Sequence, residues 1–113
     1  MKIVYNKLIR DRIPEIIEAD GKKAVIRKLE ENQLLVELSR KLEEELEEYK
    51  ADGSVQELAD LYEVIRGILR VKGVAEHDFF GIVEKKAQKR GAIQEGLLLV
   101  EVEDHTVNEN AGK

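Results

Sequence analysis

Apolar residues recur every three or four positions along two long stretches of the chain. From residue 30 to about residue 50 there is no helix breaker, and the apolar side of this stretch is formed by Leu34, Leu35, Leu38, Leu42, Leu46 and Tyr49. From residue 55 to about residue 72 the apolar side is formed by Leu58, Leu61, Tyr62, Ile65, Ile68 and Leu69. This spacing predicts two amphipathic helices.

Turn residues separate the two predicted helices. Within residues 51–54, Gly53 suits a left-handed helix end and Ser54 suits the N-cap of the next helix. So short a turn joins two helices as an antiparallel hairpin. A further helix is predicted at residues 76–90, and a short one begins near Pro14.

Two segments outside the helices have the composition of short strands. Residues 22–29 read KKAVIRKL and residues 96–104 read GLLLVEVED, which predicts two strands that pair with each other. The predicted fold is therefore mainly α, a helical bundle built on an antiparallel helix hairpin, with a small two-stranded β element. We expect residues 1–103 to form a single domain, followed by a polar, disordered tail at residues 104–113.

Composition narrows the classes of function. A chain of 113 residues with 42% hydrophobic and only 4% aromatic residues builds one modest core from Leu, Ile and Val. It has no cysteine, which excludes thiolate chemistry, and its net charge of -5 argues against nucleic acid as a partner. No apolar run is long enough to span a membrane, so we expect a cytoplasmic protein without a membrane partner. The apolar stripes are broad for a small monomer, which predicts a homodimer or homotetramer.

Four carboxylates depart from the solvent-facing pattern of the other acidic residues. On a projection of about 100° per residue, Glu45 lies at the edge of the apolar side of its helix and Glu48 lies about 60° further round. Glu57 and Asp60 lie against the apolar side of the second helix. In the hairpin, residues equally distant from the turn face each other, which places Glu45 level with Asp60 and Glu48 level with Glu57.

Such a group of carboxylates needs a cation. Four facing carboxylates repel one another strongly in a medium of low dielectric constant, and no lysine is expected between them. Oxygen ligands suit Mg²⁺, with Mn²⁺ as an alternative. Taken alone, Glu57 also fits a capping box with Ser54, but capping explains neither Glu45 nor Asp60.

A substrate with several phosphates also requires positive charge, because the protein itself is acidic. Lys7 and Arg10 near the start, and Lys86 and Arg90 on the last predicted helix, are the candidate phosphate-binding residues. Lys89 is an alternative for either of the last two. The competing interpretation of each is an ordinary surface cation.

The same residues form motifs of a known family. The pattern EExxE appears at residues 44–48 and ExxD at residues 57–60; the chain opens with YNKLIRDRIP and carries Lys86, Arg90 and Gly91 near its end. Over about residues 3–103 it resembles the MazG-like all-α nucleotide pyrophosphohydrolases, more closely the small single-domain branch that is phosphoribosyl-ATP pyrophosphohydrolase-like. Where this family more often has two glycines and an aromatic residue, the chain has Gly91-Ala92-Ile93.

The resemblance implies an activity and a set of site residues. The reaction would be Mg²⁺-dependent hydrolysis between the α- and β-phosphates of a nucleotide, releasing a monophosphate and pyrophosphate. Glu45, Glu48, Glu57 and Asp60 would hold the metal, and Glu44 would support them or orient a water, so that Glu44 and Glu45 act in catalysis. The substrate would be a nucleoside triphosphate, including non-standard ones, or alternatively phosphoribosyl-ATP of histidine biosynthesis. A non-catalytic helical scaffold or regulatory module is the alternative from another class.

Overall fold

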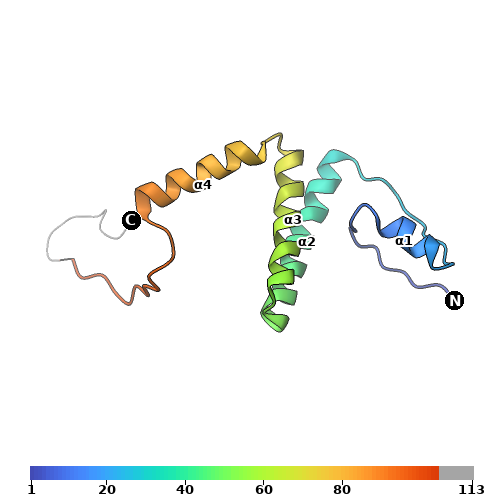
Figure 1. Ribbon diagram of the computed structural model, residues 1–113, viewed down its shortest axis with the longest axis horizontal. Coiled ribbons are helices and arrows are strands. Elements are labelled where there is room, and N and C mark those ends of the chain that lie inside the picture. The colour runs from blue at the N-terminus through green and yellow to red at the C-terminus, as the bar shows by residue number, and fades with distance from the viewer. Residues whose placement is uncertain (105–113) are drawn as a thin grey trace. The chain divides into compact units, whose positions relative to one another are not determined.

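The computed structural model describes residues 1–104, and this part of the chain is mainly helical (Figure 1). Its helices are α1 (Ile13–Ala19), α2 (Glu31–Asp52), α3 (Val55–Val71) and α4 (Glu76–Arg90). The predicted helices agree with α2, α3 and α4 to within a few residues at each end. The predicted polar tail lies, from residue 105 onward, outside the described residues.

Helices α2 and α3 pack side by side as the predicted antiparallel hairpin (Figure 1). Gly53 ends α2 in the left-handed region at φ 70°, and its N–H donates to the carbonyl of Tyr49 at 2.6 Å. Ser54 begins α3, where its Oγ accepts from the N–H of Glu57 at 3.4 Å. Turn chemistry therefore fixes the point at which the chain reverses.

A close approach between two residues fixes the register of the hairpin. Gly67 on α3 faces Leu38 on α2 so closely that a Cβ atom at Gly67 would lie 3.0 Å from a methyl carbon of Leu38. Leu38 is itself buried, as are Val64 and Leu69. Leu38 and Gly67 are equally distant from the turn, as are Glu45 and Asp60, so the pairing expected from the sequence is the one that the helices adopt.

The chain divides into two compact units, Met1–Phe80 and a second that begins at Gly81. In the first unit, Glu76 ties the start of α4 to α3, because its carboxylate accepts from Tyr62 Oη at 2.7 Å and from Arg66 Nε at 2.8 Å. The ring of Tyr62 also stacks on that of Phe80 at a centroid distance of 6.4 Å. The remainder of α4 belongs to the second unit.

The predicted two-stranded β element is wrong for the described residues. No residue from 1 to 104 belongs to a strand, and both segments expected to pair lack regular secondary structure and are mostly exposed, for example Val25 at 86% and Leu98 at 86%. A two-stranded ribbon is at best marginal in water unless a third strand or a helix covers it. Aliphatic composition therefore does not by itself produce a strand here.

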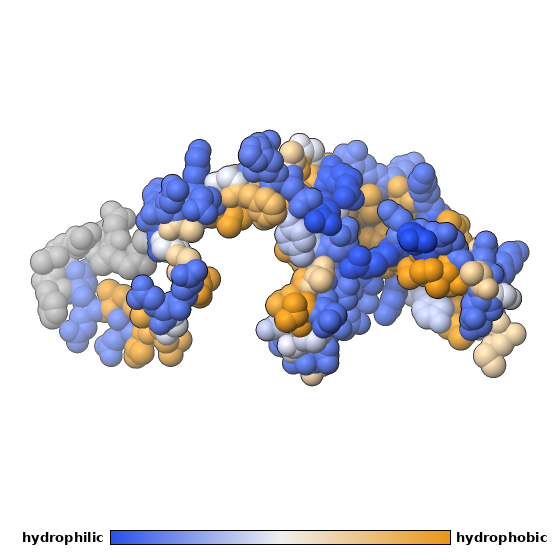
Figure 2. Space-filling view, viewed as in Figure 1, coloured by the Kyte–Doolittle hydropathy of each residue, from blue (hydrophilic) through white to orange (hydrophobic). Residues whose placement is uncertain are grey.

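Much apolar surface remains on the described residues. Figure 2 shows hydrophobic side chains, in orange, at the surface of both the hairpin and α4. On the hairpin, Val36 is 53% exposed, Leu46 46% and Leu58 45%. None of the described helices has the length and apolarity needed to cross a membrane.

Candidate metal centre

Three of the four predicted metal ligands come together between α2 and α3. Glu45, Glu57 and Asp60 each offer one carboxylate oxygen, and these three atoms all lie within 4.8 Å of one another. Glu57 and Asp60 are three residues apart and so share a face of α3, and the hairpin register places Glu45 opposite them. We call these three residues the acidic cluster.

Burial leaves two oxygens of the acidic cluster without a partner. Glu45 is only 6% exposed although it is charged in its ordinary state. Oε2 of Glu45 and Oε2 of Glu57 are buried and receive no hydrogen bond. Buried carboxylate oxygens are normally satisfied by a donor or by a cation, because desolvation without compensation costs several kcal/mol. This pair of oxygens is the strongest local indication that the acidic cluster could hold a cation.

Burial and mutual repulsion also raise the pKa values of two carboxyl groups in the acidic cluster. The pKa of Glu45 is raised to about 7, chiefly by burial and then by the neighbouring Glu48 carboxyl, with which it can share a proton; the charge of Lys41 opposes this rise and that of Asp60 adds to it. Burial also raises the pKa of Glu57, and the charges of Glu48, Asp60 and Asp52 add to this effect. A divalent cation would remove both causes, since it replaces lost hydration and screens the repulsion.

Glu48 is the predicted ligand that the structure does not place in the acidic cluster. Its side chain is exposed on α2, one turn beyond Glu45. Its charge is nevertheless close enough to raise the pKa of both Glu45 and Glu57. Its role as a metal ligand stays a prediction.

The donor set of the acidic cluster fits a hard divalent cation. All of its donors are carboxylate oxygens, which Mg²⁺ and Mn²⁺ prefer to nitrogen or sulfur. Glu45, Glu57 and Asp60 would hold the ion. Three carboxylates also leave coordination positions for water or for phosphate oxygens, which is the usual arrangement when Mg²⁺ binds together with a substrate.

Two of the predicted phosphate-binding residues lie beside these carboxylates. Arg10 Nη2 is 2.6 Å from Oδ1 of Asp60, and Lys7 Nζ is 3.3 Å from Oε1 of Glu44. The segment before α1 is thus held against the hairpin by charge. Both cations remain about half exposed and so remain accessible to a ligand.

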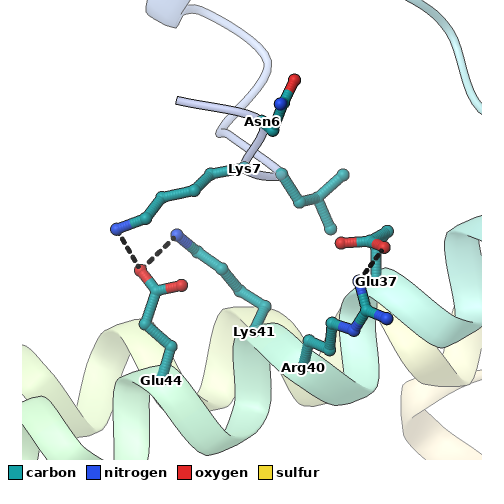
Figure 3. Close-up of a pocket in the computed structure, with 7 residues that line it drawn as sticks. Asn6, Lys7, Glu37, Arg40, Lys41 and Glu44 are labelled. Carbon is teal, nitrogen blue, oxygen red and sulfur yellow. Dashed lines mark hydrogen bonds and ion pairs between the residues drawn. The ribbon is translucent and has the colours of Figure 1, made fainter. Parts of the chain in front are cut away.

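Lys41 is a residue that the sequence reasoning missed. The sequence predicts no lysine between the four carboxylates, yet Lys41 Nζ is 3.6 Å from Oε1 of Glu45 and 3.3 Å from Oε1 of Glu44. The available signal was its spacing, since it precedes these residues by three and four positions on one helix. Figure 3 shows Lys7 and Lys41 converging on Glu44.

These residues line a small pocket. Its volume is about 120 Å³, and its walls are formed by Asn6, Lys7, Leu8, Glu37, Arg40, Lys41 and Glu44 (Figure 3). Arg40 pairs with Glu37 at 2.9 Å, so the pocket carries three cations and two carboxylates. All three cations are paired with these carboxylates, since Lys7 and Lys41 both contact Glu44.

The other two predicted phosphate-binding residues belong to the second unit. Lys86 and Arg90 are exposed on α4, as is the alternative Lys89. Their participation in phosphate binding stays a prediction.

Comparison with known proteins found a partial relative. An uncharacterized protein of Mycolicibacterium smegmatis is 47% identical over 45 residues, which cover 40% of this chain and 46% of that protein. The match therefore spans less than half of the relative's length. No family model matches the chain, and no solved structure matches it significantly.

Proposed function

We propose that this protein is a divalent-metal-dependent nucleotide pyrophosphohydrolase of the MazG-like type. It would hydrolyse the bond between the α- and β-phosphates of a nucleoside triphosphate, non-standard nucleotides included, to a monophosphate and pyrophosphate. The observation that carries the proposal is the acidic cluster, whose oxygens lie within 4.8 Å of one another while two carboxylate oxygens are buried without a donor.

The acidic cluster would hold Mg²⁺, or Mn²⁺ in its place. When bound, such an ion neutralises charge on phosphate oxygens and lowers the pKa of a coordinated water. The chain's part is to fix the three carboxylates on two packed helices, so that their geometry does not have to be organised during binding. No nucleophilic side chain is required for this chemistry.

Glu44 is suited to orient a water. Partial burial would raise its pKa, but hydrogen bonds from Lys7 and Lys41 outweigh this and lower the pKa below its ordinary value. The carboxylate is therefore ionised and accepts hydrogen bonds. Lys41 Nζ lies 3.3 Å from Oε1 of Glu44 and 3.6 Å from Oε1 of Glu45, so one ammonium group links Glu44 to the proposed metal ligand.

Arg10 and Lys7 are suited to hold the phosphates. A guanidinium group matches phosphate oxygens with two parallel hydrogen bonds, and an ammonium group adds a point charge. In the first unit both lie at the rim of the carboxylates, on a segment without regular secondary structure. A bound phosphate would replace Asp60 as the partner of Arg10 and Glu44 as the partner of Lys7.

We also propose that the protein is a homo-oligomer, a dimer or a tetramer. The hairpin consists of two helices, and large apolar side chains stay exposed on both of them although they pack against each other. Burial of Val36, Leu46 and Leu58 against a second copy would remove their exposed surface from water.

A panel of nucleotides tests the proposal. The purified protein is incubated with Mg²⁺ and each of the standard triphosphates, several non-standard triphosphates and phosphoribosyl-ATP, and pyrophosphate and orthophosphate are measured separately. Release of pyrophosphate without orthophosphate, abolished by a chelator, is the expected result. Preferred turnover of phosphoribosyl-ATP would assign the histidine pathway, and no release from any compound by the folded protein would favour the scaffold alternative.

A further inference from the structure

Lys41 contacts two neighbouring carboxylates that have different proposed tasks. Its Nζ lies 3.3 Å from Oε1 of Glu44, the proposed water-orienting group, and 3.6 Å from Oε1 of Glu45, a proposed metal ligand. The Lys41 side chain is 22% exposed and that of Glu45 is 8% exposed, so the contact is largely removed from solvent. Such a contact is screened less than a surface ion pair.

The two oxygens of Glu45 have different surroundings. Oε1 faces the ammonium group of Lys41, whereas Oε2 is buried and receives no hydrogen bond. An ammonium group on one oxygen restricts rotation of the carboxylate. It thereby leaves Oε2 as the oxygen that is available to a cation.

We propose that Lys41 is a positioning residue of the metal centre, which orients Glu45 so that Oε2 is presented to a divalent cation and which keeps Glu44 at the rim. The inference rests on the proposed function, because it assumes that the acidic cluster binds the cation. It adds a residue outside the EExxE and ExxD motifs to the site.

Lys41 has two opposing effects on the affinity of the acidic cluster for a divalent cation. A positive charge near the acidic cluster repels a divalent cation, which would make Lys41 a competitor. However, Glu44 lies 3.3 Å from the same ammonium group, and this carboxylate, which Lys41 shares with Lys7, offsets part of its charge. Orientation therefore outweighs repulsion, and groups that orient metal ligands in this way typically contribute about 10- to 100-fold in metal affinity.

Titration calorimetry with Mn²⁺ alone tests the proposal without reference to turnover. The variants are Lys41→Met, which removes the ammonium group but keeps the length of the side chain, and Lys41→Arg, which keeps the charge and the donors. Lys50→Met is the matched control, because Lys50 forms a comparable pair with Glu47 at 3.6 Å on the same helix, with both side chains exposed. Urea unfolding of each variant verifies that it is folded.

The expected result is that Lys41→Met weakens Mn²⁺ binding by about tenfold or more, that Lys41→Arg restores most of the affinity, and that Lys50→Met binds as the wild type does. If the wild type binds Mn²⁺ and Lys41→Met binds it equally or more tightly, the role of Lys41 is refuted while the metal centre stands. If the wild type itself binds no Mn²⁺, the metal centre and the inference are both refuted.

Discussion

Arg10 Nη2 lies 2.6 Å from Oδ1 of Asp60, although 50 positions separate the two residues in the sequence. This ion pair brings the segment before α1 to the edge of the acidic cluster. A candidate phosphate ligand and a candidate metal ligand are therefore direct neighbours, as a site for a metal–phosphate complex requires.

Replacement of Arg10 should separate a role in substrate binding from a role in folding. The side chains of the pair are 56% and 38% exposed, so the pair contributes at most about 1 kcal/mol to the free energy of unfolding. Arg10→Gln should therefore unfold in urea almost as the wild type does, while its KM for the nucleotide rises by about tenfold or more. The control is Arg12→Gln, since Arg12 forms an exposed pair with Glu15 on α1. An unchanged KM in Arg10→Gln would exclude Arg10 from phosphate binding.

The raised pKa of Glu45 predicts how stability depends on pH when a chelator is present. The pKa rises from 4.5 to about 7 on folding, so the protonated form favours the folded state. This stabilisation is complete below about pH 4.5 and is lost as the pH rises through 7. The free energy of unfolding of the wild type should fall over this range by about 1–3 kcal/mol relative to that of Glu45→Gln. Parallel pH profiles for the two proteins would show that folding does not raise the pKa of Glu45.

The contact between Leu38 and Gly67 predicts a size limit at position 67. Gly67→Ala removes the helix penalty of glycine, about 0.5–1 kcal/mol, while the end of the Leu38 side chain must shift slightly. These effects oppose each other, so this variant should lie within about 1 kcal/mol of the wild type. Gly67→Leu should destabilise the protein by about 1–3 kcal/mol in urea unfolding. As a control, Gly81→Ala on α4, where nothing lies within 4 Å, should gain stability.

The exposed apolar residues of the hairpin predict the oligomeric state. Light scattering at micromolar concentration should give a mass of at least twice the 12.9 kDa of one chain. A charge in the interface costs several kcal/mol unless it is paired, so Leu46→Glu or Leu58→Glu should shift the protein toward the monomer. Glu47→Gln, at an exposed polar position, should leave the mass unchanged. A monomeric wild type would contradict the proposed oligomer.

Local signals made the hairpin and most of the acidic cluster predictable. Spacing of apolar residues and the turn at Gly53 determine which residues of α2 and α3 are level, and this alone brings Glu45 to Asp60. The direction of the Glu48 side chain was harder to predict. A long side chain at the edge of the interface can point either to the cluster or to solvent, and a helical projection does not distinguish the two.

Contacts between segments distant in the sequence were not predictable in the same way. The pairing of Arg10 with Asp60 depends on the path of a segment without helical periodicity. The prediction of two strands was wrong because strand pairing depends on another element that covers the strands. The local sequence around Val25 and Leu98 does not reveal whether such an element is present. The contact of Lys41 with Glu45 contradicts the expectation that no lysine lies between the carboxylates, although their spacing of four positions on one helix permits such a contact.

The most direct test of the central claim is Mg²⁺-dependent pyrophosphate release by the wild type, Asp60→Asn and Glu47→Gln, measured at equal concentrations of folded protein. The account predicts release by the wild type and by Glu47→Gln, whose side chain is exposed, and loss of at least about a hundredfold in Asp60→Asn. Equal release by all three proteins would show that the acidic cluster is not the site of the reaction.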